Sequence, residues 1–216
     1  MFVQQGRNHG WIEVICGPMF SGKTEELIRR LKLAQIAKQR VQIFKPALDR
    51  RYDEGCITSH AEQKFICTPI QKIQKLMENL DDETRVVGID EAQFFGPEIS
   101  EICNKVANRG LRVIAAGLDQ DYLGNAFGPM PKLLAIADTV LKLKAVCMVC
   151  GGEASKSQRL TRESTQVVVG AGEHYEARCR ACFDPSLKVT QSLPALPVSK
   201  VRTQNGKSKT RAVIPA

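Results

Sequence analysis

Eight residues near the N-terminus, GPMFSGKT at positions 17–24, restrict the possible folds of this chain more than any other feature. They fit the pattern G-x-x-x-x-G-K-[ST], between an apolar stretch, WIEVIC, and a segment with helical spacing of apolar residues. Such glycines let backbone N–H groups surround phosphate oxygens, while the lysine reaches the β and γ oxygens and the threonine hydroxyl can ligate magnesium. A chance match in a strand–turn–helix connection is the alternative, but the context favours binding of ATP or GTP. The predicted nucleotide-binding residues are Gly17, Pro18, Met19, Phe20, Ser21, Gly22, Lys23 and Thr24.

Strand-like and helical patterns alternate along most of the chain. Strands are expected at 11–16, 41–45, 85–90, 111–119 and 139–147, and helices at 24–39, 69–80, 97–110 and 131–138. This alternation predicts βαβ units and a parallel sheet. The expected fold class is therefore α/β, a P-loop NTPase-like (RecA-like) parallel sheet flanked by helices over residues 10–146.

The stretch VVGIDEAQFF, residues 86–95, places Asp90 and Glu91 side by side at the end of an apolar strand. In P-loop proteins an acid at the end of a neighbouring strand holds the magnesium ion, and Asp90 suits that role. Asp90 therefore joins the predicted ATP-binding residues. Glu91 is left to accept a proton from an attacking hydroxyl or water. The alternative is an acid at a helix start that only favours the helix dipole.

Two C-x-x-C pairs, Cys147 with Cys150 and Cys179 with Cys182, stand 28 residues apart. Four thiolates complete a tetrahedral zinc site without an open position, so a structural zinc ion is expected. A redox-active pair is the competing interpretation, but one pair would suffice for that. A zinc-binding domain is predicted at 147–183. The other four cysteines, at 16, 56, 67 and 103, lie in apolar contexts and are expected to be buried.

The segment between the two cysteine pairs contains an apolar strand, Gly170, Gly172 and Tyr175. Zinc would hold both ends of a long loop that carries permissive glycines and one aromatic ring. Such a loop could be a lid that closes over a flat ligand and excludes water. A plain structural zinc ribbon is the alternative.

Composition indicates a water-soluble chain with a mildly basic body. The formal net charge is +8, and from Asp184 onward six Lys and Arg residues face a single acidic one. This Pro-, Ser- and Lys-rich tail, 184–216, is expected to be disordered, with contact to nucleic acid as an alternative role. No apolar run approaches the roughly 18 residues of a membrane span, and the N-terminus lacks a signal-peptide pattern. A cytoplasmic protein without membrane partners is expected, with reduced thiols.

The combination of motifs resembles one known family. GPMFSGKT, DEAQFF, GLDQDYLGNAFG, KAVCMVC and VVVGAGEHYEARCRAC are similar, in order, to the zinc-containing cytosolic (type II) thymidine kinases. The resemblance extends from about Ile12 to Cys182. It implies a transferase that moves the γ-phosphate of ATP to the 5′-hydroxyl of thymidine and gives thymidine monophosphate (dTMP) for nucleotide salvage and DNA synthesis. It also implies a homotetramer, feedback inhibition by thymidine triphosphate (dTTP), magnesium with ATP, and a zinc-ribbon/lasso module.

The resemblance assigns roles to individual residues. Glu91 matches the general base of the family. The thymidine-binding residues that it implies are Met19, Phe94, Leu118, Tyr122, Phe127, Val168, Gly170 and Tyr175. Those implied near magnesium and the phosphates are Thr24, Asp49, Arg51 and Asp90. The chain departs from the family pattern at Ala61–Gln63, where a glycine is common, which leaves the conformation of that loop open.

Two other classes of function compete with a kinase. One is a P-loop ATPase whose zinc ribbon and basic tail bind nucleic acid, although no basic stripe interleaved with aromatic residues supports it. The other is a regulatory nucleotide-binding module without turnover, which the pairing of Lys23 with Glu91 disfavours. No nucleic acid is therefore expected to be required.

Overall fold

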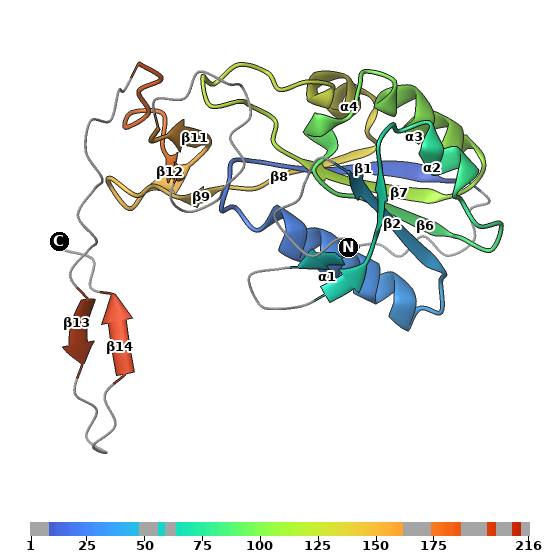
Figure 1. Ribbon diagram of the computed structural model, residues 1–216, viewed down its shortest axis with the longest axis horizontal. Coiled ribbons are helices and arrows are strands. Elements are labelled where there is room, and N and C mark those ends of the chain that lie inside the picture. Colours follow the sequence, from blue (N-terminus) through green and yellow to red (C-terminus); the bar gives the residue numbers. More distant parts are fainter. Residues whose placement is uncertain are drawn as a thin grey trace.

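The computed structural model describes residues 9–47, 56–58, 64–161, 174–186, 198–201 and 209–212. Its centre is a six-stranded sheet in which each hydrogen-bonded pair of neighbours is parallel (Figure 1). The strand order is β5-β2-β6-β7-β1-β8, with β1 at Trp11–Cys16, β2 at Val41–Pro46, β5 at Thr68–Ile70, β6 at Val86–Ile89, β7 at Arg112–Gly117 and β8 at Thr139–Lys142. The predicted fold class, a parallel sheet flanked by helices, is confirmed.

Helix α1, Lys23–Ile36, covers one face of the sheet (Figure 1). Its buried apolar side chains recur three and four residues apart, which is the spacing that the sequence shows: Leu27, Ile28, Leu31 and Ala34. They pack against Ile15, Ile43 and Ile114 of the sheet. The apolar face of α1 therefore forms one of the two halves of the core.

The opposite face lies under the remaining helices of the sheet domain. These are α2 at Lys75–Glu78, the 3-10 helix η1 at Ala92–Phe94, α3 at Ile99–Asn108 and α4 at Met130–Ile136. Ile12, Val14 and Val113 of the strands pack against them, whereas Ile15 of β1 belongs to the other half. Successive strand residues thus point to opposite faces, and both faces are apolar, as a parallel sheet requires.

The expected helix at 69–80 is wrong in its first half. Residues Thr68–Ile70 form the edge strand β5, and the α-helix is limited to Lys75–Glu78. Ile70, Ile73 and Leu76 are all buried in the same half of the core. Ile70 reaches it from β5, Ile73 from the following turn and Leu76 from α2, so apolar residues three positions apart are buried there without a continuous helix. Pro69 fits the edge strand, where its missing N–H is tolerated.

The expected last strand, 139–147, is divided. Only Thr139–Lys142 belongs to the central sheet, as β8, and Leu143 donates its backbone N–H to Cys16. The chain then enters a smaller region built from the antiparallel pairs β9–β10 and β11–β12 (Figure 1). Its strands are β9 at Ala145–Val146, β10 at Glu153–Ala154, β11 at Lys156–Arg159 and β12 at Tyr175–Arg178. We call the described residues 145–161 and 174–186 the cysteine module.

Two further pairs of antiparallel strands complete the described secondary structure. β3, Cys56–Thr58, pairs with β4, Lys64–Ile66, and β13, Val198–Val201, pairs with β14, Lys209–Ala212. The second pair lies within the tail, so that part of the tail has strand conformation, and disorder of its remainder stays a prediction. Among the described residues, no helix has the length and apolar content that crossing a bilayer requires.

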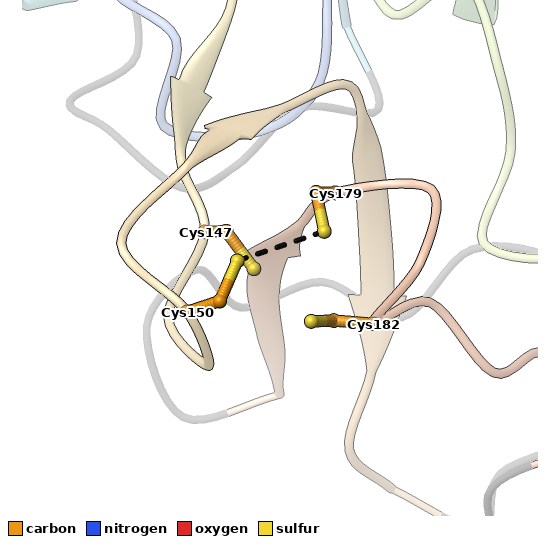
Figure 2. A group of neighbouring side chains, drawn as sticks. All are labelled: Cys147, Cys150, Cys179 and Cys182. Atoms are coloured by element: carbon orange, nitrogen blue, oxygen red, sulfur yellow. Dashed lines mark hydrogen bonds between the residues drawn. The ribbon is translucent and has the colours of Figure 1, made fainter.

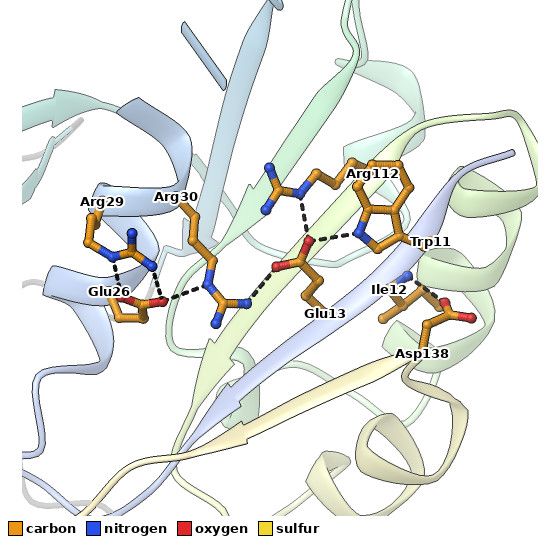
Figure 3. Close-up of polar contacts among 8 residues, drawn as sticks. All are labelled: Trp11, Ile12, Glu13, Glu26, Arg29, Arg30, Arg112 and Asp138. Carbon is orange, nitrogen blue, oxygen red and sulfur yellow. Dashed lines mark hydrogen bonds and ion pairs between the residues drawn. The ribbon is translucent and has the colours of Figure 1, made fainter. Parts of the chain in front are cut away.

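A buried ionic network ties the middle of α1 to the sheet near the amino-terminal ends of β1 and β7 (Figure 3). The GPMFSGKT loop lies at the opposite, carboxyl end of β1. The Glu13 carboxylate on β1 accepts hydrogen bonds from Arg30 of α1 at 2.5 Å, from Arg112 of β7 at 2.6 Å and from the Trp11 indole at 2.7 Å. Burial raises the pKa of Glu13, but Arg112 and Arg30 outweigh it and hold the pKa below its ordinary value. Glu13 is therefore a paired anion in the core.

Candidate active site

The loop between β1 and α1 needs glycine at two positions for different reasons. Gly17 has φ 145°, and a Cβ atom there would lie 2.5 Å from the carbonyl oxygen of Leu143. Gly22 has φ 80°, and an added Cβ would meet only the Glu25 carboxylate at 3.8 Å. At Gly17 the neighbouring backbone excludes a side chain, whereas at Gly22 the left-handed conformation alone favours glycine. Helix α1 then begins at Lys23, as the motif predicts.

The Lys23 side chain folds back over this loop. Its Nζ donates a hydrogen bond to the carbonyl oxygen of Pro18 at 2.6 Å, and the Ser21 hydroxyl donates to the same oxygen at 2.8 Å. Burial lowers the pKa of Lys23, and the nearby carboxylates of Glu91 and Asp90 counteract part of that effect. The ammonium group thus lies between a loop suited to phosphate and a pair of acids.

Asp90 and Glu91 follow β6, and β7 separates that strand from β1 in the sheet. The carboxyl ends of both strands nevertheless bring Thr24 and Asp90 together, with the threonine Oγ1 donating to Oδ2 of Asp90 at 3.3 Å. Asp90 is 7% exposed, and its Oδ1 accepts the backbone N–H of Glu91 at 3.0 Å. A hydroxyl and a carboxylate, two oxygen ligands of the kind that magnesium prefers, therefore meet beside the loop.

Glu91 has a left-handed backbone, φ 50° and ψ 42°, at the start of η1. Its carboxylate Oε2 accepts a hydrogen bond from the side-chain amide of Gln93 at 2.5 Å. The Gln93 carbonyl oxygen in turn accepts the backbone N–H of Leu118 at 2.9 Å, and Gln93 is only 2% exposed. Gln93 thus fixes the position of the Glu91 carboxylate relative to the loop after β7.

That loop, residues 118–127, is shaped by Asp121. Its Oδ1 accepts the backbone N–H groups of Leu123 and Asn125, both at 2.9 Å, and Gln120 pairs with Ala126 across the turn. The turn returns the chain so that the Phe127 ring meets the Phe94 ring edge to face, with centroids 5.7 Å apart. Two of the predicted pocket aromatics, from segments 33 positions apart, are therefore in contact.

Strand β11 of the cysteine module connects these segments. The Ser157 hydroxyl accepts the backbone N–H of Met19 at 2.9 Å, and Lys156 donates to Gln120 at 2.6 Å. The Arg159 guanidinium lies 3.5 Å from the centroid of the Tyr122 ring. The cysteine module is thereby bound both to the phosphate-loop candidate and to the loop after β7.

The four cysteines of the two C-x-x-C pairs point toward one another (Figure 2). Their Sγ atoms all lie within 4.8 Å of each other, and Cys150 and Cys179 are 3.7 Å apart. Four thiolates about 2.3 Å from one zinc ion would be roughly 3.8 Å apart, so the residues fit a tetrahedral zinc site.

The thiols in this cluster differ in acidity because they interact. Burial raises the pKa of Cys147, but backbone N–H groups at Cys179 and Cys150 lower it more strongly, to about 6. The thiol of Cys179 raises the pKa of Cys182 to about 12. Several thiolates so close together repel one another, and a divalent cation would relieve that repulsion.

Comparison with known proteins identifies the family. Residues 10–183 match the family described as thymidine kinase. The chain belongs to the thymidine kinase family. It is 54% identical over 185 residues to the thymidine kinase of Rhodothermus sp. (strain ITI 518), covering 86% of each chain. It is 52% identical over 186 residues to the thymidine kinases of two strains of Bacteroides fragilis, covering 86% of this chain and 93% of theirs.

Membership of the thymidine kinase family confirms the family that the sequence motifs predicted. It also confirms the predicted class of enzyme, an ATP-dependent nucleoside kinase that phosphorylates thymidine.

Most of the predicted site residues lie on segments that contact one another. Thr24 contacts Asp90, Phe94 contacts Phe127, and Gln93 links Glu91 to Leu118. Four predicted residues lie outside the described part of the chain, namely Asp49, Arg51, Val168 and Gly170. The departure at Ala61–Gln63 lies outside it as well.

Sequence reasoning did not single out Gln93, Ser157 or Arg159. Gln93 stands two residues after Glu91 in DEAQFF, and a buried amide so close to a candidate base was a usable signal. Ser157 and Arg159 carry no such signal, because a polar residue in a short strand is ordinary. Both residues matter because they make the contacts between the cysteine module and the sheet domain, Ser157 with Met19 and Arg159 with Tyr122.

Proposed function

We propose that this protein transfers the γ-phosphate of ATP to the 5′-hydroxyl of thymidine, yielding dTMP for nucleotide salvage. The observation that carries the proposal is the contact of Thr24 with Asp90, with Glu91 immediately beside them. A phosphate loop, a magnesium-type ligand pair and a candidate base thus occupy one edge of the sheet. The family match supplies the identity of the nucleoside.

The proposed ATP-binding part of the site is the loop from Gly17 to Thr24. Backbone N–H groups of this loop and of the first turn of α1 would hold the phosphates, and Lys23 would neutralise charge on the transferred group. Thr24 and Asp90 would hold the magnesium ion, which when bound offsets the charge of the β- and γ-phosphates. Asp49 and Arg51 are proposed to assist near the phosphates.

Glu91 is the proposed general base. Its backbone N–H donates to Asp90, and its carboxylate interacts electrostatically with Lys23 and accepts a hydrogen bond from the Gln93 amide. From that position it would accept the proton of the thymidine 5′-hydroxyl as the oxygen attacks the γ-phosphorus. The leaving group is ADP, and the proton remains on Glu91 until product release.

The thymidine pocket would be formed by residues from four segments, most of them aromatic or apolar. Phe94 and Phe127 form one edge-to-face pair, and Tyr122 and Tyr175 both contact Arg159. Flat rings packed in this way suit a pyrimidine base. The full proposed set is Met19, Phe94, Leu118, Tyr122, Phe127, Val168, Gly170 and Tyr175.

The four cysteines are proposed to hold a structural zinc ion. The spacing of their sulfur atoms supports this, and the ion would fix the two ends of the segment between residues 150 and 179. We further propose a homotetramer that works in the cytoplasm, where thiols stay reduced, with dTTP acting as a feedback inhibitor. Light scattering tests the homotetramer, and kinase assays with added dTTP test the feedback inhibition.

One assay separates the kinase from an ATPase that acts on nucleic acid. Purified protein is mixed with ATP, magnesium and thymidine, and dTMP is measured by chromatography. In a parallel reaction DNA replaces thymidine, and phosphate release is measured. We expect dTMP in the first reaction and only basal hydrolysis in the second. Hydrolysis stimulated by DNA, with no dTMP formed, would overturn the proposal.

A further inference from the structure

Arg159 stands out among the buried polar residues because it joins two aromatic rings from distant segments. It lies on β11 and is 4% exposed. Its Nη2 and Nε donate to the hydroxyl oxygen of Tyr175 at 2.7 and 3.1 Å. Its guanidinium carbon lies 3.5 Å from the centroid of the Tyr122 ring. A planar cation at that distance is in stacking contact.

The two rings come from different parts of the fold. Tyr175 begins β12 and is the cross-strand partner of Arg159, whereas Tyr122 lies in the loop after β7 of the central sheet. Asp121 fixes that loop through two backbone N–H groups, so the Tyr122 backbone is already constrained. Arg159 adds the contact that places the ring relative to Tyr175.

The same strand also reaches the phosphate loop. Ser157 and Arg159 are two residues apart on β11 and therefore point to the same side of the strand. Ser157 accepts the backbone N–H of Met19, and Arg159 contacts Tyr122. One strand face thus contacts both the loop proposed for ATP and the loop proposed for the nucleoside, but through separate residues.

We propose that Arg159 is a positioning residue that sets the affinity for the nucleoside. It holds the Tyr122 and Tyr175 rings at a fixed separation, so that the pyrimidine enters a preformed site. This inference rests on the proposed function, in which both rings line the thymidine pocket. Within the part of the chain that the structure describes, strand β11 contacts the loop of residues 17–24 through Ser157. We therefore expect the affinity for ATP to be unaffected by replacement of Arg159.

An arginine suits this task better than a lysine. The guanidinium is planar, so one face can stack on Tyr122 while its edge donates two hydrogen bonds to the Tyr175 hydroxyl. A lysine ammonium supplies the charge but neither the flat face nor the fork of donors. Arg159→Lys is therefore a variant that separates geometry from charge.

The test is steady-state kinetics on full-length, zinc-loaded Arg159→Met and Arg159→Lys. We expect Arg159→Met to raise KM for thymidine about 10- to 100-fold, the effect of losing a buried cation–π contact together with its hydrogen bonds. KM for ATP should stay within about twofold, because the remaining contacts to the phosphate loop are intact. Arg159→Lys should recover only part of the loss.

A double-mutant cycle makes the readout specific. Tyr175→Phe removes only the hydroxyl that Arg159 contacts, and its KM for thymidine should rise by a smaller factor. The double variant Arg159→Met/Tyr175→Phe should be no worse than Arg159→Met, since the contact is already lost. Fully additive effects would mean that the two residues act separately and would overturn the proposal.

Arg112→Met is the matched control. Arg112 is also a largely buried arginine near an aromatic ring, 5.5 Å from the Trp11 centroid, but it belongs to the remote ionic network. This variant should lose thermal stability while KM for thymidine is unchanged. If Arg159→Met behaves like Arg112→Met, Arg159 is only structural and the proposal fails.

Two further outcomes are decisive. If Arg159→Met does not fold, Arg159→Lys and Tyr175→Phe carry the test, and an unchanged KM for thymidine in both would refute the inference. If the native protein makes no dTMP at all, both the proposed function and this inference are refuted. Formation of dTMP by the native protein, with an unchanged KM in the variants, would reject this inference alone.

Discussion

At the scale of single residues, the unusual backbone of Glu91 indicates function. A positive φ of 50° is uncommon for a residue with a long side chain and costs free energy relative to an extended or helical conformation. In that conformation the Glu91 carboxylate accepts a hydrogen bond from the Gln93 amide and interacts electrostatically with Lys23. Such strain accumulates at sites where the direction of a side chain matters more than stability.

Replacing Glu91 by Gln tests the assignment of the base. The amide keeps the size and hydrogen-bonding reach of the side chain but cannot accept a proton. We expect thymidine and ATP to bind normally and single-turnover transfer to slow by roughly 10² to 10⁴, the usual contribution of a positioned base. Because phosphoryl transfer depends largely on positioning and charge, the loss should lie toward the lower limit.

Glu98→Gln provides the control for that experiment. Glu98 is an exposed acid seven positions further along, at the start of α3, so its replacement should leave transfer unchanged. If Glu91→Gln transfers phosphate at the native rate with saturating substrates, Glu91 is not the general base and acts only as an acidic residue at a helix start. Asp90→Asn should differ from both variants, because it should weaken magnesium-dependent nucleotide use as well as turnover.

Lys23→Ala should abolish phosphoryl transfer while the fold persists. The ammonium group would stabilise oxygens that gain charge in the transition state, so its loss acts on turnover. The exposed Lys105→Ala variant on α3 removes the same charge elsewhere and should remain active. Phosphoryl transfer and circular dichroism are measured on both variants. Near-normal turnover by Lys23→Ala would contradict the assignment of residues 17–24 as a phosphate loop.

At the scale of elements, α1 is held at two places. Its N-terminal turn carries Lys23 and Thr24 at the site, and its middle is tied to β1 through Arg30 and Glu13. Glu26 extends this network, since it pairs with Arg29 and Arg30 at 2.6 and 2.7 Å (Figure 3). The helix that follows the proposed phosphate loop is therefore held by ion pairs as well as by its apolar face.

The anchoring by Glu26 should depend on pH in a defined direction. The hydrogen bonds from Arg29, aided by Arg30, lower the pKa of Glu26 from 4.5 to about 2. A lowered pKa in the folded state gives stability that is present above pH 4.5 and is lost as the pH falls through 2. The difference in unfolding free energy between the native protein and Glu26→Gln should therefore shrink across that window, by at most about 1.4 kcal/mol per pH unit.

Urea unfolding at several pH values between 5 and 2 measures this difference. Comparing two proteins at each pH cancels the contribution of the proposed zinc site, which both share. A difference that stayed constant across the window would show that Glu26 has an ordinary pKa in the folded protein.

At the scale of the whole molecule, two regions meet where the proposed substrates would lie. The central sheet supplies the phosphate loop, Asp90, Glu91 and the loop after β7. The cysteine module contributes β11, whose side chains contact Met19, Gln120 and Tyr122, and β12, which carries Tyr175. The four-cysteine cluster lies in the region that supplies Arg159 and Tyr175, so metal binding and nucleoside binding should be linked.

Cys179→Ser tests that linkage. Losing one thiolate should remove the zinc ion, and the loosened module should impair use of thymidine more than use of ATP. Metal analysis and KM for each substrate give the readout. Cys103→Ala is the control, because this buried thiol lies in α3 and should cost stability but not zinc. Cys179→Ser with full zinc and native kinetics would break the link between the cluster and the site.

The sequence alone determined the features whose chemistry is local. The motif in residues 17–24 predicted a strand, a tight loop and a helix start, which are defined within a few residues, and the structure has all three there. The paired C-x-x-C motifs predicted the four-cysteine cluster for the same reason. Hydrophobic periodicity located most strands and helices, although the spacing of Ile70, Ile73 and Leu76 fitted a helix as well as the observed edge strand.

Only the tertiary structure decided which distant residues meet. The strand order places Thr24 against Asp90 across an intervening strand, and the packing of the cysteine module on the loop after β7 places Arg159 on Tyr122. The motifs had already predicted Thr24 and Asp90 at one magnesium ion, whereas the contact of Arg159 with Tyr122 has no signature in spacing. Those two partners are separated by tens of residues, and their types are ordinary for a strand or a loop. Local patterns specify elements through backbone sterics and burial, whereas the position of Arg159 depends on how whole surfaces fit together.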